Sequence, residues 1–285
     1  MRWLATVEGV TTTASAPVGK LLREWRARRR LSQLDLSIQA DISARHLSFV
    51  ETGRSRPTRR MILRLSEHLD VPLRERNQLL LAGGYAPAYP QHGLDEPQIG
   101  AVRDALMQVL RSHEPFPAVV INRWWDMVDG NRAIGLFVAD CAPELLEPPV
   151  NVLRLTLHPD GVAPRIVNLG QWRAHLLQQL HQRAVQTGDA RLHELEAELR
   201  GYPGGDHDLT LAPTDVVLPL QLRHHGRQLS LFSIEARVGT ANDITVDELM
   251  IEAFYPADAE TKRALTAGEA AATTSARNWR TMTGA

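Results

Sequence analysis

The 285-residue sequence predicts an all-α domain of five short helices followed by an α+β domain built on one antiparallel sheet. Apolar residues recur at helical spacing before residue 85, whereas short apolar runs separated by turn residues dominate after Phe116. Residues 17–65 hold twelve Lys or Arg and four Asp or Glu, a net charge of +8. The whole chain carries −1, so the remainder sums to −9. A basic segment in a chain whose remainder is acidic is typical of a polyanion-binding domain joined to a separate domain.

Composition also predicts the domain boundaries. We expect residues 1–17 to form a flexible leader, residues 18–85 the all-α domain, and residues 86–97 a linker rich in Pro and Gly. The α+β domain then covers residues 98–258, and residues 259–285 form a C-terminal helix and tail.

Several classes of protein are excluded by what the sequence lacks. Cys141 is the only cysteine, so neither an intrachain disulfide nor a cysteine-based zinc site can form. No apolar run reaches the length of a membrane span, and residues 1–17 lack the core of a signal peptide, so we predict a cytoplasmic protein. The sequence contains no zincin pair, nucleophile elbow or phosphate-binding glycine loop, so we predict no enzymatic activity, no metal and no cofactor.

Residues at the helix starts justify the five helices of the first domain. Side chains that accept hydrogen bonds from free backbone N–H groups favour such starts, and proline suits the first turn. The starts are expected at Val18, Ser32, Ser43, Thr58 and Pro72, and the last helix ends at Gly83 and Gly84.

The second and third of these helices have the layout of a helix-turn-helix, joined by a turn over residues 40–42. This motif places its second helix in the major groove of DNA, so double-stranded DNA is the predicted partner. Asp41 occupies the position in the turn where the backbone tends to be left-handed, a conformation that Asp tolerates better than most residues.

The segment resembles the repressor/Cro-type helix-turn-helix of the XRE family of bacterial regulators. The resemblance is carried by Leu31-Ser-Gln33, Leu36, Ala40, Ile42-Ser43, Leu47, Val50-Glu-Thr-Gly-Arg54 and Pro57. It implies that Gln33 contacts phosphate, that the start of the third helix reads bases, and that Glu51 pairs internally with Arg26 rather than with DNA.

The predicted DNA contacts follow from this placement. Base reading is expected from Ala44, Arg45 and Phe49, because Arg binds guanine with two hydrogen bonds and an apolar side chain can meet a thymine methyl. Contacts to the DNA backbone are expected from Gln33, Ser43, His46, Arg54, Arg56, Arg59 and Arg60. For His46, exposure to solvent is an equally good interpretation. A single motif reads few base pairs, so we expect a homodimer on paired half-sites.

The α+β domain is expected to begin with a helix over residues 99–112. Strands are expected over residues 118–121, 125–128, 151–157, 216–223, 229–237 and 248–255, with a hairpin turn at residues 224–228. Helices are expected over residues 131–138, 171–184 and 191–199. Alternation along a strand would place Trp124 and Trp125 on opposite faces, and Asn131 is expected to cap the helix that follows it.

This part resembles the MmyB-like ligand-binding domain, a PAS-like fold found C-terminal to XRE-type DNA-binding domains in actinobacterial and related regulators. The resemblance is carried by residues 120–133 (VINRWWDMVDGNRA), Leu136-Phe137 and residues 151–154 (NVLR). It implies a cavity between sheet and helices that binds a small, mostly apolar molecule such as a fatty acid. The candidate lining residues are Trp124, Trp125, Met127, Phe137, Trp172, Leu176, Leu180 and Phe232.

Two interpretations of this domain remain open at the level of sequence. For each candidate lining residue taken singly, ordinary core packing is the favoured interpretation. The domain could sense a ligand for a transcriptional repressor, or it could act only as a dimerisation or protein-interaction module.

Overall fold

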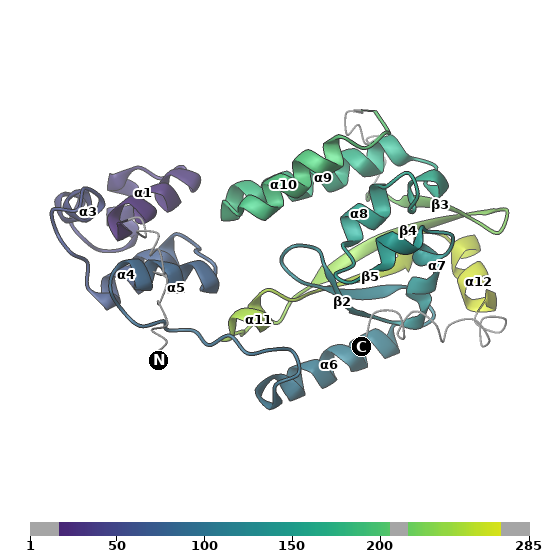
Figure 1. Ribbon diagram of the computed structural model, residues 1–285, viewed down its shortest axis with the longest axis horizontal. Helices are drawn as coiled ribbons and strands as arrows, with labels where there is room; N and C mark the ends of the chain where they lie inside the picture. The colour runs from purple at the N-terminus through teal and green to yellow at the C-terminus, as the bar shows by residue number, and fades with distance from the viewer. Residues whose placement is uncertain (1–16, 206–215, 269–285) are drawn as a thin grey trace, which may run out of the picture. The chain divides into compact units, whose positions relative to one another are not determined.

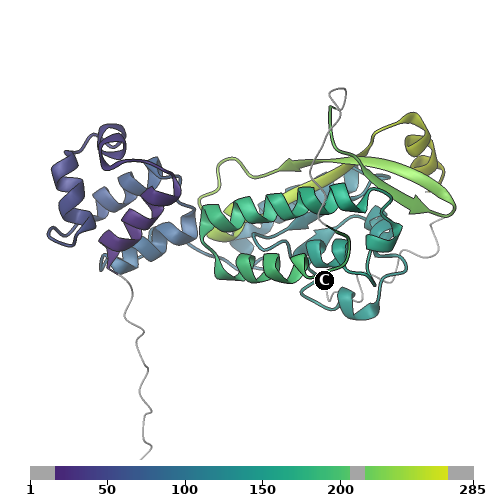
Figure 2. The ribbon, with the colours of Figure 1, turned by 90° about the horizontal axis from the view of Figure 1, so that it is seen from above.

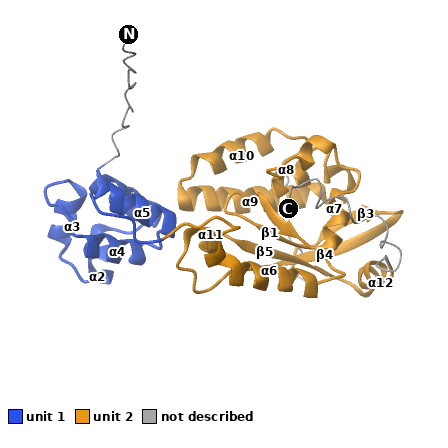
Figure 3. Ribbon diagram, turned by 60° about the horizontal axis from the view of Figure 1, so that its bottom comes forward, with its two compact units in different colours: residues 1–89 blue, residues 90–285 orange. Residues whose placement is uncertain are grey.

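The computed structural model describes residues 17–205 and 216–268 and divides into two compact units, residues 1–89 and residues 90–285 (Figure 3). The leader expected over residues 1–17 lies outside the described residues except for Pro17, and so does the predicted tail beyond Gly268. No helix within the described part is both long and apolar enough to cross a bilayer.

Five helices form the described part of the first unit, as predicted. They are α1 (Val18–Arg28), α2 (Gln33–Gln39), α3 (Ala44–Glu51), α4 (Arg59–His68) and α5 (Leu73–Ala82). Their buried faces meet in one apolar core that includes Leu22, Trp25, Leu36, Leu47, Val50, Ile62, Leu65, Leu69, Leu79 and Leu80. Spacings of three, as between Leu22 and Trp25, between Leu47 and Val50 and between Ile62 and Leu65, explain why the sequence indicated these helices so directly.

The second unit contains a five-stranded antiparallel sheet in the order β2-β1-β5-β4-β3. The strands are β1 (Ala118–Ile121), β2 (Met127–Gly130), β3 (Leu220–His224), β4 (Arg227–Ala236) and β5 (Met250–Pro256). The helices are α6 (Gly100–Ser112), α7 (Gly135–Val138), α8 (Val152–Leu157), α9 (Leu169–Thr187), α10 (Ala190–Arg200), α11 (Ile244–Asp247) and α12 (Ala259–Gly268). This is the α+β architecture that the sequence predicts.

Helices cover both faces of the sheet (Figure 1). Alternate residues of β1 and β5 separate two cores: Ile121 and Phe254 pack with α9, whereas Val120 and Ile251 pack with α6. Helices α9 and α10 lie side by side over the first of these faces (Figure 2).

The hairpin between β3 and β4 is confirmed. Its two loop residues, His225 and Gly226, have φ of 47° and 75°, which is the backbone that a two-residue hairpin turn requires.

The strand predicted over residues 151–157 is wrong, because this segment is helix α8. Asn151 caps the helix by accepting a hydrogen bond from the Arg154 N–H at 3.1 Å. Leu153, Leu155 and Leu157 are all buried, so both sides of a short helix are covered and its burial alternates like that of a strand.

Three other strands begin later than predicted. Strand β2 begins at Met127 because Trp125 has φ of 62° and lies in a turn, so alternation does not govern Trp124 and Trp125. Strand β3 begins at Leu220, directly after Pro219, which has no N–H to donate. Strand β5 begins at Met250 because the short helix α11 occupies the preceding residues.

The Asn131 side chain does not cap the helix that follows it, contrary to the prediction. Its Oδ1 accepts from the Ala118 N–H at 3.1 Å, and its Nδ2 donates to the carbonyls of Leu110 at 3.1 Å and Phe116 at 2.7 Å. The buried amide thus joins the end of α6 to the start of β1.

Candidate functional site

The helix-turn-helix is shaped by residues that the sequence singled out. The Ser32 hydroxyl and the Asp35 carboxylate form a capping box at the start of α2, and Ser43 Oγ accepts from the His46 N–H at 3.1 Å at the start of α3. Asp41 has φ of 45°, the left-handed backbone expected between the two helices. Helix α3 is therefore fixed at its N-terminal end, where its side chains would meet DNA.

The open face of α3 carries the three residues predicted to read bases. Arg45 is exposed, Ala44 and Phe49 are half-buried, and the Arg45 guanidinium lies over the Phe49 ring at 5.4 Å. The ring leaves the guanidinium donors at the edge of the group available for a partner. This face offers one cation and two apolar groups side by side, the combination that suits guanine and the thymine methyl.

The predicted pair between Arg26 and Glu51 is present. Arg26 Nε and Nη2 donate to the two Glu51 carboxylate oxygens at 2.6 and 2.7 Å, and Gln33 Nε2 donates to the same carboxylate at 2.8 Å. Burial raises the pKa of Glu51, but the hydrogen bonds from Arg26 and Gln33 and the charge of Arg26 outweigh it, so the pKa lies below its ordinary value. This network joins α1, α2 and the end of α3.

The remaining predicted contacts to the DNA backbone divide into two groups. Arg54, Arg59 and Arg60 are exposed beside α3 and at the start of α4. Arg56 instead donates from Nη2 to the Gly83 carbonyl at 2.9 Å, and its guanidinium lies near the Tyr85 ring. Arg56 therefore joins the loop after α3 to the end of α5, and it is exposed to solvent like the other three arginines.

Seven of the eight predicted ligand-lining residues share one apolar core on the α9 face of the sheet. Trp125, Trp172, Leu176 and Leu180 are buried in this core, and Trp124, Met127 and Phe137 pack against it partly buried. Phe232 lies elsewhere, because its ring stacks on Tyr255 at 5.6 Å, on the face that α6 covers.

A pocket of about 300 Å³ lies along α9 and α10. Its lining residues are Arg173, Ala174, Leu177, Gln178, His181, Arg200 and Gly205. None of the predicted ligand-lining residues is among them.

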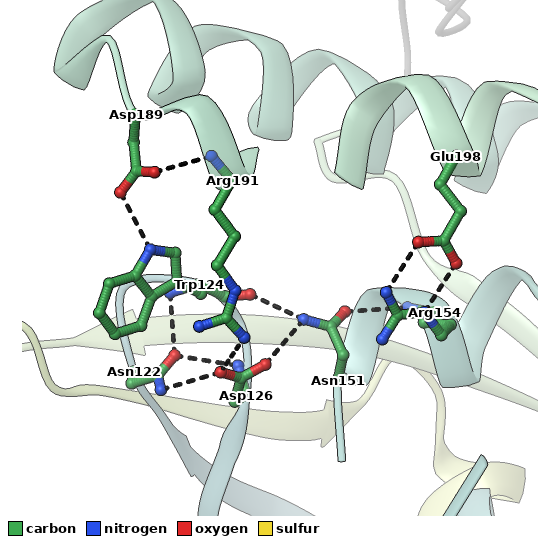
Figure 4. Close-up of polar contacts among 8 residues, drawn as sticks. All are labelled: Asn122, Trp124, Asp126, Asn151, Arg154, Asp189, Arg191 and Glu198. Atoms are coloured by element: carbon green, nitrogen blue, oxygen red, sulfur yellow. Dashed lines mark hydrogen bonds and ion pairs between the residues drawn. The ribbon is translucent and has the colours of Figure 1, made fainter. Parts of the chain in front are cut away.

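The segment between β1 and β2 forms a tight polar turn (Figure 4). Asn122 Oδ1 accepts from the N–H groups of Trp124 and Asp126 at 2.9 and 3.0 Å, and the Asn122 Nδ2 donates to the Asp126 carboxylate at 3.2 Å. Asn151 Nδ2 donates to the Trp124 carbonyl at 2.7 Å and to the Asp126 carboxylate at 3.1 Å. The turn is thus held to the start of α8.

The same turn is held to α10 through side chains. The Trp124 indole N–H donates to Asp189 at 2.9 Å, and Arg191 Nη2 donates to Asp126 at 2.7 Å (Figure 4). The guanidinium groups of Arg123 and Arg191 lie over the Trp124 ring at 5.4 and 4.8 Å. The polar residues of the motif around Trp124 therefore connect sheet and helices, and the Trp124 indole takes part in this polar network.

Sequence reasoning missed a charged row on the α9 face. Glu235 of β4 stands directly opposite Glu252 of β5, and His175 of α9 lies within the electrostatic reach of Glu235. Burial raises the pKa of Glu252 to about 7, with a further increase from the Glu235 charge and a decrease from the hydrogen bond with Ser233. The exact pairing of β4 with β5 would have revealed this row, but strand register cannot be read from either strand alone.

A family model described as the MmyB-like transcription regulator ligand binding domain matches residues 102–267, more than half of the chain. The chain belongs to this family. A second model, described as a helix-turn-helix domain, matches residues 17–79. This MmyB-like regulator thus combines an N-terminal helix-turn-helix, which implies DNA binding, with a C-terminal domain of a family named for ligand binding. Both matches point to a transcription regulator and not to an enzyme, as predicted.

Comparisons with individual proteins add little to the family assignment. No curated protein matches the MmyB-like regulator. Among solved structures, it is similar to an RNA-binding light-oxygen-voltage receptor at 13% sequence identity, over 93% of this chain and 69% of that chain, with a TM-score of 0.25. Within residues 17–205 and 216–268, no three His, Cys, Asp or Glu residues are grouped so that they could hold a metal ion.

Proposed function

We propose that the protein is a sequence-specific repressor whose C-terminal domain responds to a small apolar ligand such as a fatty acid. The observation that carries the DNA-binding part is the open face of α3, where Arg45 and Phe49 are presented by a helix capped at Ser43. Arg45 would bind guanine O6 and N7, while Ala44 and Phe49 would meet a thymine methyl. The protein would act in the cytoplasm, where its DNA lies.

Backbone contacts would orient this face. Ser43 lies at the N-terminal end of α3, and its hydroxyl hydrogen is free to donate while its oxygen accepts from His46. Gln33 Nε2 carries two hydrogens, and one of them donates to Glu51, so the other can reach phosphate. Arg54, Arg59 and Arg60 supply the positive charge, which fixes register without reading sequence.

A homodimer fits this mode of recognition. One helix-turn-helix reads only a few base pairs, and a dimer doubles the site by placing two α3 helices about 34 Å apart along the DNA. Ligand would change DNA affinity only if it binds two states of the dimer unequally.

Selection of bound DNA from a random pool tests base reading. We expect Arg45→Ala to relax the preferred sequence and to cost about 1–3 kcal/mol at the wild-type site. Arg54→Ala is the matched control, since loss of a backbone contact should weaken binding to all sequences and leave the preferred sequence unchanged. An unaltered preference in Arg45→Ala would rule out the base-reading role.

Mass spectrometry of material extracted from the purified protein tests the ligand. We expect an amphiphilic small molecule to be present and cell lipid extract to change DNA affinity. Absence of bound lipid together with no effect of the extract would favour the role as a dimerisation or protein-interaction module.

A further inference from the structure

Backbone groups at the two outer edges of the sheet have partners within the domain. At one edge, the Met127 N–H of β2 donates to the Val150 carbonyl at 2.7 Å. At the other edge, the Val167 N–H donates to the Gln221 carbonyl of β3 at 2.8 Å, and Asn168 Oδ1 accepts from the Gln221 N–H at 3.0 Å. Such covering protects strand edges from pairing with other chains.

Strand β4, in contrast, leaves part of its own edge open. It has 10 residues, whereas its neighbour β3 has 5 and begins at Leu220, opposite Leu231. Residues 232–236 of β4 therefore extend past the end of β3. Among the residues that the structure describes, none pairs with this segment on the side of β3. Pro219, directly before β3, has no N–H with which to extend the ladder.

The open backbone groups belong to Ser233 and Glu235. Ser230 faces the side of β5, because its N–H donates to Thr261 Oγ1 at 2.9 Å and its carbonyl accepts from the Ala257 N–H at 2.8 Å, and both partners follow β5 in the chain. Backbone direction alternates along a strand, so the even-numbered residues of β4 face β5 and the odd-numbered ones face away from it. The N–H and C=O groups of Ser233 and Glu235 thus point to the open side.

We propose that a second copy of this chain pairs with β4 along this edge, antiparallel and about a twofold axis at Ile234. Ser233 of each copy then lies opposite Glu235 of the other, and each such pair exchanges both of its N–H···O=C hydrogen bonds. The two sheets become one continuous sheet. The inference rests on the proposed function, because it names the interface of the proposed homodimer.

The register of this pairing follows from the residues along the edge. An axis at Glu235 would place two carboxylates directly opposite each other, which is destabilising. An axis at Ser233 would require the edge of Leu231, which β3 already occupies. With the axis at Ile234, Ala236 lies opposite residue 232 of the other copy, so β4 ends where the space taken by β3 begins.

The side chains at this edge suit contact between two copies. Phe232, Ile234 and Ala236 form an apolar row on the α6 face, and Ile234 is 50% exposed. The twofold axis brings the two Ile234 side chains together and covers them. On the α9 face, the two Glu235 residues would be diagonal neighbours, with Cα atoms about 7–8 Å apart. Each Glu235 is within electrostatic reach of Arg183 in its own chain, which reduces their mutual repulsion.

Sedimentation velocity of the full chain over a range of concentrations tests the interface. Glu235→Pro removes an N–H that is unused within one copy, and proline is tolerated at such positions of an edge strand. Glu235→Gln keeps the N–H and is the matched control. We expect the proline variant to raise the Kd of the dimer at least about tenfold, through lost backbone hydrogen bonds, and the glutamine variant not to weaken the dimer.

Charge pairs at Ile234 test the axis independently. Ile234→Lys places two cations opposite each other and should also weaken the dimer, whereas Val109→Lys, at an exposed apolar residue of α6, should not. An equimolar mixture of Ile234→Lys and Ile234→Glu chains should dimerise again, because opposite charges then meet across the axis. Circular dichroism verifies that each variant retains its fold, and the mixture decides the matter if Glu235→Pro does not fold.

The outcomes separate this interface from the proposed function. Weakened dimers in the proline and lysine variants, with recovery in the mixture, would support the paired edges. Wild-type dimers that tolerate every variant would overturn this interface and leave the proposed homodimer intact. Weakening without recovery in the mixture would overturn the axis at Ile234. A wild type that is monomeric both alone and on its selected DNA site would overturn the interface together with the homodimer.

Discussion

Glu252 makes the stability of the ligand-binding domain depend on pH. In the folded chain its pKa is about 7, above the ordinary value for glutamate, because burial and Glu235 disfavour its charge. A folded pKa that exceeds the unfolded one means that the folded protein binds more protons between the two values. Burial of the Glu252 carboxylate therefore lowers the free energy of unfolding only where the carboxylate ionises. This loss is absent below the unfolded pKa, grows as pH rises toward 7, and is constant at higher pH.

We expect Glu252→Gln to raise the free energy of urea-induced unfolding relative to wild type at pH 8. At pH 4, below the ordinary pKa of glutamate and far below its pKa in the folded chain, the wild-type side chain is mostly protonated in both states, so the two proteins should differ little. Glu194→Gln, at an exposed position of α10, is the control and should follow wild type at both pH values. Parallel stability curves for wild type and Glu252→Gln from pH 4 to pH 8 would contradict this assignment.

Among the elements, helix α8 depends on Asn151 in two ways. The Asn151 carbonyl oxygen caps the helix, and its amide nitrogen donates to Trp124 and Asp126 across to the β1–β2 turn. The substitution Asn151→Asp separates the cap from the donated hydrogen bonds. Aspartate also caps helices, but its ionised side chain cannot donate a hydrogen bond and would face the Asp126 carboxylate.

We expect Asn151→Asp to destabilise the domain at pH 7 by about 2 kcal/mol or more, through the lost donor bonds and the repulsion from Asp126. Asn151→Ser, which also caps but adds no charge, should cost less. The measurement is thermal unfolding of both variants, and a harmless Asn151→Asp would mean that capping is the residue's whole contribution.

Sequence patterns predicted the elements unevenly, for physical reasons. The helices of the first unit have one apolar face each, so the repeat of Leu22 and Trp25, or of Ile62, Leu65 and Leu69, indicated them directly. Helix α8 is only six residues long and covered on two sides, so its periodicity was indistinguishable from that of a strand.

The sequence also predicted only some of the contacts in the candidate site. The Arg26–Glu51 pair could be placed because one motif positions both residues, whereas Glu235 and Glu252 meet only through the pairing of β4 with β5. The turn at Trp125 was missed because its left-handed backbone depends on Asn122 and Asn151, which act from either side of it.

At the scale of the whole molecule, the division of charge predicts how DNA binding responds to salt. The basic segment over residues 17–65 carries +8, and the rest of the chain carries −9. Binding should weaken steeply as salt increases, because each phosphate neutralised by Arg releases counterions.

Arg59→Ala should reduce the slope of log K against log salt by about 1 and weaken binding to every sequence alike. Arg227→Ala is the control, because Arg227 is an exposed arginine at the start of β4 that is not predicted to contact DNA, and we expect no change in slope. Filter-binding titrations between low and moderate salt measure the affinity and the slope for both variants. An unchanged slope in Arg59→Ala would exclude a phosphate contact at that position.

The carboxylate of Glu51 has a consequence for the speed of recognition. It receives donors from α1 and α2 while lying at the end of α3, so the three helices share one anchor before any DNA is present. The conformational entropy of the recognition helix is then lost during folding and not during docking. Encounter with DNA should therefore be governed by diffusion and electrostatic steering, with association as a single kinetic step.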